Sequence, residues 1–241
     1  RYHLQDVLDN YEGSVYLVWG FQDWNVDPYH AFPTFNMLND AGIHTRAIVG
    51  QWAHNYPDQP DRHDDLESGY GSEAFPNMSR MDWAIELYNW FNYYLKGIGE
   101  EPAPIAQVQT NNGHWHEEDK WPTEDANWEL ITLDSAEASG GLVSASSDAS
   151  FIIPSFEEDV IISGLPTLHL SVQTPIIPCN GGQVFATMYD DETGLRLGHA
   201  TMDLRYRDGG YEAKAVLPSQ TYVMLMEFNP LDVYLPAGHS I

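Results

Sequence analysis

Two short apolar runs, each closed by a glycine, constrain the fold of this chain more than any other feature. The first, Val15–Trp19, is followed by Gly20, and the second is Ala47–Gly50. Continuous apolar runs bounded by glycines are typical of strands that a parallel sheet buries on both faces. Since one predicted helix lies between them, the runs are expected to be neighbouring parallel strands of an α/β sheet.

The helix between these strands is predicted over Tyr29–Ala41, with Gly42 as its end. Asp27 is a suitable N-cap, and Pro28 suits the first helical position. Pro33 predicts a kink or a later start, because proline removes a helical hydrogen bond. The apolar residues at helical spacing are Phe32, Phe35 and Leu38.

A long loop over residues 55–77 precedes a second amphipathic helix, SRMDWAIELYNWFNYYLKG. Ser79 and Asp82 resemble a capping box at its start, and Lys96-Gly97 is a typical helix end. Its apolar stripe is expected to pack against the protein. The stripe is Met81, Ile85, Tyr88, Phe91 and Leu95.

After about residue 100 the pattern changes to short runs with alternating or β-branched residues. Clusters of Gly, Pro, Asn and Asp separate these runs, as in an all-β sandwich or jelly roll. Two domains are therefore predicted, an α/β part at 1–100 and a β-sandwich at 101–241, with neither end complete. The runs are AQVQT, WELITL, DVIISG, TLHLSVQT, GQVFATMYD, HATMDLRYR and YEAKAVL.

The charge of the chain is strongly negative. Asp and Glu number 36 against 10 Lys and Arg, which gives a formal net charge of −26. Acids spread through every segment favour a protein kept soluble at high salt, where self-repulsion is screened. The chain has no basic patch for nucleic acid and no membrane-spanning run. Two locations stay open: the cytoplasm of a salt-accumulating organism, or secretion with a signal upstream.

The two predicted strands each lead to a side chain that can handle a proton. Asp23 follows the first strand and His54 follows the second. Functional groups of parallel sheets collect at the carboxyl ends of strands, so these residues are expected to meet. A carboxylate that accepts the imidazole Nδ1–H leaves the other ring nitrogen free to activate a nucleophile. Asp27 is a rival acid, but its place before Pro28 favours a capping role.

The sequence offers other histidines and acids with a weaker case for a metal site. His114 and His116 would share one face of a strand, and His63-Asp64-Asp65 is a second grouping, but no further ligands follow at metal spacing. The acidic loop Asp58–Glu67 lacks the spacing of a calcium loop. No metal and no cofactor are expected, and the lone Cys179 is interpreted as structural.

Five segments, in order, resemble the Xaa-Pro dipeptidyl-peptidase and cocaine-esterase (CocE/NonD-like) serine hydrolases. They are WGFQDWNVDP, VGQWAH, WFNYYLKGI, VQTNNGHWHEEDKWP and LPAGH. The resemblance spans essentially the whole chain. It implies the C-terminal part of an α/β-hydrolase domain followed by a jelly-roll (galactose-binding-like) domain.

The same resemblance assigns roles to two residues. The acid of the family's G-x-x-D-x-x-V segment matches Asp23, and the base of its G-P-W-x-H segment matches His54. Gln51 stands where the family has proline. No G-x-S-x-G occurs in the chain, so the serine nucleophile is expected upstream of residue 1. Trp24 and Trp52 flank the pair and are candidate walls of a substrate pocket.

The leading hypothesis is a dipeptidyl-peptidase-like hydrolase that acts on a peptide and takes its serine from an upstream segment. An esterase or acylase of the cocaine-esterase type, acting on a small ester or amide, is the first alternative. A non-catalytic β-sandwich that binds carbohydrate or a protein is the second; an exposed aromatic platform on the sandwich, with Asp23 and His54 pointing apart, would support it. A homo-oligomer stays open.

Overall fold

The structure is a computed structural model of the whole chain. It describes residues 8–23, 26, 28–52, 54, 56–58, 80, 82–123, 126–133, 150–176 and 181–241. The chain forms two compact units. The first comprises residues 1–126, 162–164 and 232–234, and the second comprises 127–161, 165–231 and 235–241.

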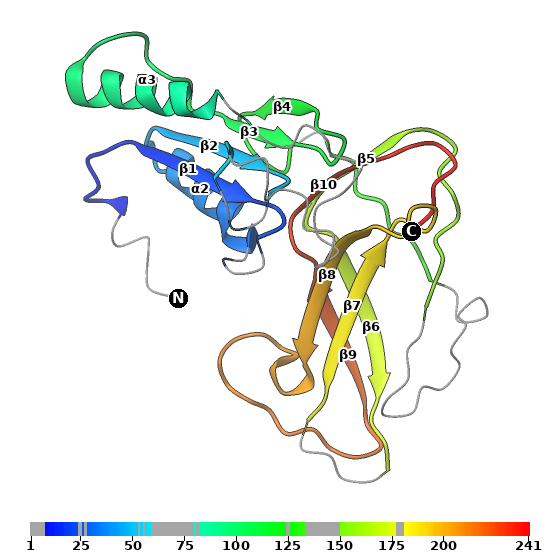
Figure 1. Cartoon of the computed structure of the whole chain (residues 1–241). Coiled ribbons are helices and arrows are strands. Elements are labelled where there is room, and N and C mark those ends of the chain that lie inside the picture. Colours follow the sequence, from blue (N-terminus) through cyan, green and yellow to red (C-terminus); the bar gives the residue numbers. More distant parts are fainter. Residues whose placement is uncertain are drawn as a thin grey trace. The chain divides into compact units, whose positions relative to one another are not determined.

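The first unit is built on a four-stranded sheet in the order β1-β2-β3-β4 (Figure 1). The strands β1, β2 and β3 are parallel, and β4 is antiparallel to β3. Strand β1 is in register with β2, so that Gly20 lies opposite Gly50. The predicted pair of neighbouring parallel strands is confirmed. The bounds are β1 Val15–Gly20, β2 Thr45–Gly50, β3 Ala106–Gln109 and β4 Trp115–Glu118.

Burial differs between the two predicted strands. Strand β2 is buried along nearly its whole length, as expected for a strand with a neighbour on each side. Only Gly20 of β1 is fully buried, and its other residues are half-buried. The expectation that both strands are buried on both faces is therefore wrong for β1. Within the described chain β1 is an edge strand, and an edge strand leaves one side uncovered.

Helix α2, Ala31–Asp40, follows the short 3-10 turn η1, Pro28–His30, and covers one face of this sheet. Pro33 is the third residue of the helix, where a missing N–H costs no helical hydrogen bond. The late start is thus confirmed. The three predicted apolar positions are all buried, and two of them join a core with Val49 and Trp121. The expected cap Asp27 lies outside the described residues.

Helix α3, Trp83–Lys96, packs through a different face from the one predicted. Trp90 is its one buried residue, and its ring meets that of Tyr16 edge-on at 5.3 Å. Arg46 extends from β2 to Glu86 of the helix at 3.2 Å. Side chains of successive strand residues point to opposite faces, so α3 covers the face opposite α2.

The predicted stripe of α3 is largely solvent-exposed, which is a correction. Exposed fractions run from 49% to 75% at Ile85, Tyr88, Phe91 and Leu95. The helix carries apolar residues on two sides, and spacing alone does not say which side faces the sheet. The predicted end is confirmed, because Gly97 adopts the left-handed conformation (φ 67°) and donates a hydrogen bond to the carbonyl of Tyr93. The helix starts after Asp82, whose side chain makes no capping bond.

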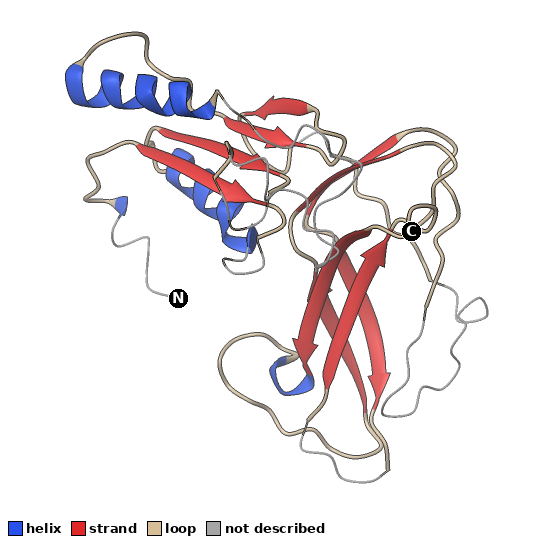
Figure 2. Ribbon diagram, viewed as in Figure 1, coloured by secondary structure: helices blue, strands red, loops and turns tan. Residues whose placement is uncertain are grey.

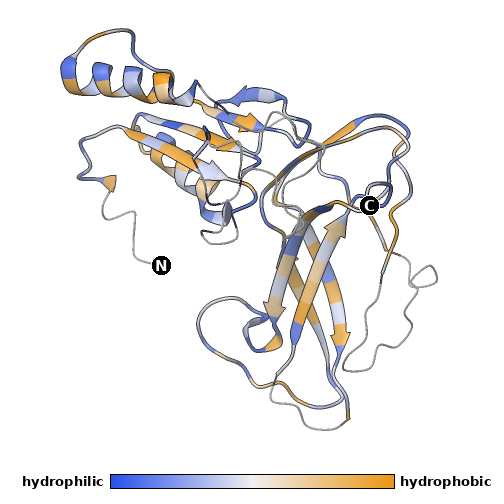
Figure 3. Ribbon diagram, viewed as in Figure 1, coloured by the Kyte–Doolittle hydropathy of each residue, from blue (hydrophilic) through white to orange (hydrophobic). Residues whose placement is uncertain are grey.

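The second unit consists mainly of two antiparallel strand pairs, β6 with β9 and β7 with β8, and its described residues contain almost no helix (Figure 2). Hydrophobic and hydrophilic residues alternate along β6 (Figure 3), and the burial of β6 and β7 alternates with the same period of two. Their inner faces share one core built on Ala200, Met224 and Met226. The bounds are β6 Thr167–Gln173, β7 Gln183–Tyr189, β8 Arg196–Asp203, η3 Leu204–Tyr206 and β9 Thr221–Glu227.

One further strand pair, β5 (Val160–Gly164) with β10 (Leu231–Leu235), carries residues of both units. Residues 162–164 of β5 and 232–234 of β10 are grouped with the first unit. The two compact units are thus not the predicted ranges 1–100 and 101–241. The domain boundary itself stays a prediction.

Several predicted β-runs have a different role. AQVQT supplies β3 of the first sheet instead of a strand of the sandwich. All four residues Ala106–Gln109 are buried, which is typical of an internal strand of a parallel sheet. WELITL and YEAKAVL contain no described strand, and Trp128 and Leu130 of the former are 78% and 88% exposed. The mostly β character of the C-terminal part is confirmed, and its jelly-roll topology stays a prediction. Among the described residues, no helix has the length and apolarity needed to cross a membrane.

Candidate active site

The exits of β1 and β2 lie next to each other because the parallel pairing continues beyond both strands. The N–H of Phe21 donates to the carbonyl of Gly50 at 2.8 Å. The N–H of Gln22 donates to the carbonyl of Trp52 at 3.2 Å. The two loops that carry the predicted acid and base are therefore held together by backbone hydrogen bonds.

Asp23 and His54 meet at these exits. His54 Nδ1 lies 2.9 Å from Asp23 Oδ2. Asp23 Oδ1 accepts a hydrogen bond from the N–H of Val26 at 2.8 Å, so both carboxylate oxygens are engaged. The aspartate side chain is 9% exposed and the histidine side chain 54% exposed. A fixed, buried carboxylate against Nδ1 orients an imidazole whose ring remains accessible to solvent, as a general base requires.

Three glutamines are hydrogen-bonded to one another at the exits of β1, β2 and β3. Gln51 is 1% exposed, and its Nε2 donates to the carbonyl of Gln109 at 2.7 Å. Gln22 Nε2 donates to Gln51 Oε1 at 2.9 Å. Sequence reasoning noted Gln51 only as a departure from the family's proline and did not identify the other two. The available signal was a glutamine within two residues of the glycine that closes each of the first two strands.

Trp52 is part of the interior around β2. It is 1% exposed, and its ring centroid lies 6.0 Å from that of Trp115. Its predicted role in a substrate pocket stays a prediction, and its burial gives it a packing role. Trp24, the other predicted wall, lies outside the described residues, as do His63-Asp64-Asp65 and Cys179.

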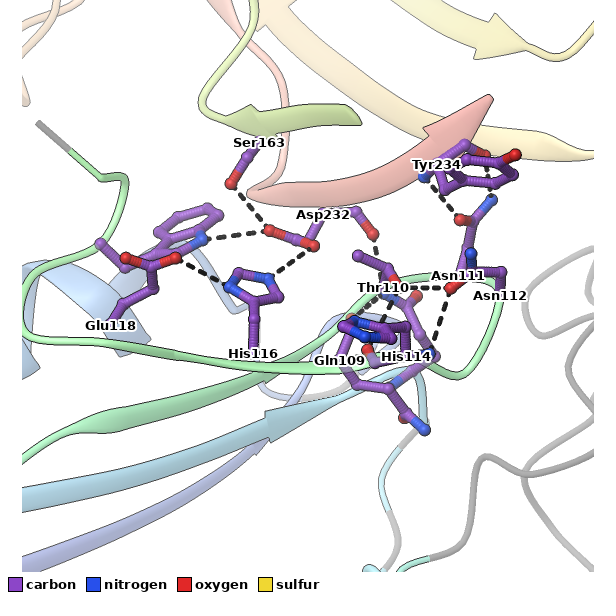
Figure 4. Close-up of polar contacts among 12 residues, drawn as sticks. Gln109, Thr110, Asn111, Asn112, His114, His116, Glu118, Ser163, Asp232 and Tyr234 are labelled. Carbon is purple, nitrogen blue, oxygen red and sulfur yellow. Dashed lines mark hydrogen bonds and ion pairs between the residues drawn. The ribbon is translucent and has the colours of Figure 1, made fainter. Parts of the chain in front are cut away.

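A second polar cluster, centred on Asp232 of β10, was not predicted (Figure 4). Asp232 is 0% exposed. Its Oδ2 accepts hydrogen bonds from Ser163 Oγ at 2.7 Å and from Trp121 Nε1 at 3.3 Å. Its Oδ1 lies 3.1 Å from His116 Nε2. An aspartate inside the apolar strand LDVYL was the one sequence signal, since a buried carboxylate needs such partners.

His116 lies between two carboxylates. Its Nδ1 is 2.8 Å from Glu118 Oε1, while its Nε2 faces Asp232. The hydrogen bond to Asp232, with the negative charges of both carboxylates, raises the pKa of His116 above its usual value against the opposing effect of burial. Both ring nitrogens are thus taken up by protein groups. Figure 4 shows His114 on the neighbouring turn, where its backbone N–H donates a hydrogen bond to Asn112 Oδ1.

Among the described residues of the second unit, one group of side chains could hold a metal ion. Ligand atoms of Asp190, Glu192 and His239 lie within 4.8 Å of one another. Hydrogen bonds already engage them: His239 Nδ1 lies 3.0 Å from both oxygens of Asp190, and Glu192 accepts from the N–H of Ser240. Hydrogen bonding accounts for the grouping, and the expected absence of a metal stays a prediction.

The sequence pattern of the family described as X-Pro dipeptidyl-peptidase C-terminal non-catalytic domain matches residues 96–241. The chain belongs to this family. Asp23 and His54 lie outside the part that matches this domain family, whereas Gln109, His116 and Asp232 lie inside it.

Two curated Bacillus proteins named as Xaa-Pro dipeptidyl-peptidases are similar to this family member along its whole length. The Bacillus anthracis protein is 22% identical over 275 aligned positions, which cover 100% of this chain and 42% of the relative. The Bacillus cereus protein is 21% identical and is covered to 43%. The chain therefore spans less than half the length of the curated relatives it matches.

Solved structures of hydrolases share the fold. A CocE/NonD family hydrolase from Staphylococcus aureus superposes with a TM-score of 0.67 and 13% identity, covering 97% of this chain and 46% of that chain. An α-amino acid ester hydrolase superposes with a TM-score of 0.63 and 16% identity, covering 98% and 48%. At these identities the likeness establishes the fold alone.

Proposed function

We propose that this chain is the C-terminal part of a serine hydrolase of the Xaa-Pro dipeptidyl-peptidase type. In this proposal residues 1–100 complete an α/β-hydrolase domain, and residues 101–241 form an appended jelly-roll domain. The family membership of residues 96–241 and the hydrolase names of the structural neighbours support it. The observation that carries it is the 2.9 Å contact between His54 Nδ1 and Asp23 Oδ2 at adjacent strand exits.

The proposed chemistry assigns one role to each member of this pair. His54 takes the proton of a serine hydroxyl as that oxygen attacks the substrate carbonyl, and then gives the proton to the leaving group. Asp23 holds the imidazole in one orientation and stabilises the imidazolium that forms. Water, activated by His54 in turn, hydrolyses the acyl-enzyme. The serine is supplied by a segment of the protein outside this chain.

The proposed substrate is a peptide with proline in the second position. The names of the two Bacillus relatives support this choice over a simple ester. The name of the ester hydrolase neighbour keeps esters of the cocaine-esterase type as the alternative within the same mechanism. The 2.9 Å contact favours this proposal over the binding-module alternative, which side chains pointing apart would have supported.

The proposal is tested on the full-length parent protein with two chromogenic substrates, a Xaa-Pro amide and an ester with the same acyl group. We expect His54→Ala to lower kcat by about four orders of magnitude or more, as loss of a triad member does. We expect Asp23→Asn to lower it by a comparable factor, because the imidazole loses its orientation. A preference of the wild type for the Xaa-Pro amide supports the peptidase, and a preference for the ester supports the alternative.

The matched control is His114→Ala, which removes an exposed histidine of the same unit. It should leave both rates close to those of the wild type. Equal rates for the wild type and His54→Ala would refute the proposed role of the pair.

A further inference from the structure

The amide of Gln51 connects the loops that carry the acid and the base. It lies one residue beyond the end of β2 and three residues before His54. Its Oε1 accepts the hydrogen bond from Gln22, the residue that immediately precedes Asp23. One buried amide thus bridges two loops that are also joined by backbone hydrogen bonds and by the contact between His54 and Asp23.

The other atoms of Gln51 anchor this bridge to strands farther along the chain. Nε2 donates to the carbonyl of Gln109 at 2.7 Å and to the carbonyl of Asp232 at 3.2 Å. The backbone N–H donates to Gln109 Oε1 at 3.1 Å. The side-chain donors and acceptor of Gln51 therefore all have partners, which is the condition under which a buried polar network rigidifies its surroundings.

We infer that Gln51 is a positioning residue for the Asp23–His54 pair, with Gln109 as its support. A proline at position 51 would have no backbone N–H to donate and no side-chain amide. Glutamine at this position therefore makes hydrogen bonds between the loops and strands that proline could not make. Catalysis depends steeply on geometry, and a displacement of about 1 Å can cost about 100-fold in rate. The kinetic part of this inference depends on the proposed function, whereas the structural part does not.

The inference extends the role of the C-terminal segment. Gln109 and Asp232 lie within residues 96–241, which match the family described as non-catalytic. Through Gln51, two residues of this segment support the exit that carries the proposed base. Neither of them needs to touch the substrate to influence the rate.

The test compares Gln51→Ala with Gln107→Ala. Gln107 is a buried glutamine of the same sheet, 9% exposed, whose side chain binds Arg80 and Glu117 instead of Gln51. In the full-length parent we expect Gln51→Ala to lower kcat by about 10- to 100-fold while KM changes by less than about twofold. We expect Gln107→Ala to leave kcat within about twofold of the wild type.

A second readout does not require activity. In the full-length parent, labelled at the histidine ring nitrogens, the Nδ1–H of His54 should give a downfield proton resonance because it is hydrogen-bonded to Asp23. This resonance should broaden or disappear in Gln51→Ala and persist in Gln107→Ala. Persistence in both variants, with unchanged kcat, would overturn the inference.

Two further variants cover the case in which Gln51→Ala does not fold, which circular dichroism would reveal. Gln22→Ala removes the bridge from the partly buried end and should weaken the same resonance with a smaller loss of kcat. Gln51→Pro should lower kcat and weaken the resonance as Gln51→Ala does. If Gln22→Ala and Gln51→Pro both keep the wild-type kcat and resonance, the inference is contradicted. If His54→Ala does not alter the rate, the proposed function fails, and the resonance still decides the role of Gln51.

Discussion

The ring of Trp52 occupies the space that a side chain at Gly50 would need. A Cβ on Gly50 would lie well inside van der Waals contact with Cζ3 of this ring. Trp52 is itself 1% exposed and cannot move into solvent without losing its packing. The last residue of β2 is therefore required to be glycine by the tryptophan two positions later.

We expect Gly50→Ala to destabilise the protein by at least about 1–3 kcal/mol, the usual cost of overpacking a core. Urea unfolding would measure the loss. In a Trp52→Leu background the same substitution should cost less, because the clashing ring is gone. Equal costs in the two backgrounds would show that the two residues are not coupled.

The contacts of His116 predict a pH-dependent stability. Folding raises the pKa of His116. Its contribution to the free energy of unfolding is therefore complete below the unfolded-state pKa of about 6.5, and it is lost as pH rises through the higher folded-state pKa. We expect unfolding free energies from urea titrations to fall over this window in the wild type. His116→Gln should flatten the profile and cost about 3 kcal/mol at low pH, because buried Asp232 loses a charged partner. His114→Ala should keep the wild-type profile.

Helix α3 offers a direct test of which of its faces packs. Trp90 is 3% exposed and Leu95 is 75% exposed. We expect Trp90→Ala to lower the free energy of unfolding by about 3–5 kcal/mol and Leu95→Ala to change it by less than about 0.5 kcal/mol. Thermal unfolding of the two variants under identical conditions would show the difference. A large effect of Leu95→Ala would restore the stripe predicted from the sequence.

The net charge of −26 predicts a salt requirement. The screening length falls from about 8 Å at physiological ionic strength to about 3 Å at molar salt, which weakens the repulsion among the acids. We expect the free energy of unfolding to rise as potassium chloride increases over this range. Stability that is constant or lower at molar salt would contradict the interpretation of the acidic composition as an adaptation to salt.

The contact between Asp23 and His54 could be predicted because its determinants are local. Asp23 and His54 each follow an apolar run closely, and parallel neighbours bring their exits together. The Asp232 cluster could not be predicted in the same way, because its partners lie far apart in sequence: His116 and Asp232 are 116 residues apart. No periodicity within β10 indicates which strand it will contact.

The face of α3 illustrates a second limit. Apolar residues occur on two sides of this helix, and helical spacing identifies stripes without ranking them. The choice of Trp90 over Leu95 follows from the edge-on contact with Tyr16 and from the pairing of Arg46 with Glu86, and both partners lie on other strands. Tertiary contacts decided the orientation where local pattern was ambiguous.

The short segments 162–164 and 232–234 are grouped with the first compact unit although they lie deep in the C-terminal half of the sequence. A gene fusion or truncation that ended after residue 126 would remove the carbonyl of Asp232 that Gln51 binds and the carboxylate that Trp121 binds. No single cleavage point separates the two units with their hydrogen bonds intact. Recombination between homologues would have to exchange the first 126 residues together with 162–164 and 232–234 to keep these hydrogen bonds. We therefore expect the two units to evolve together.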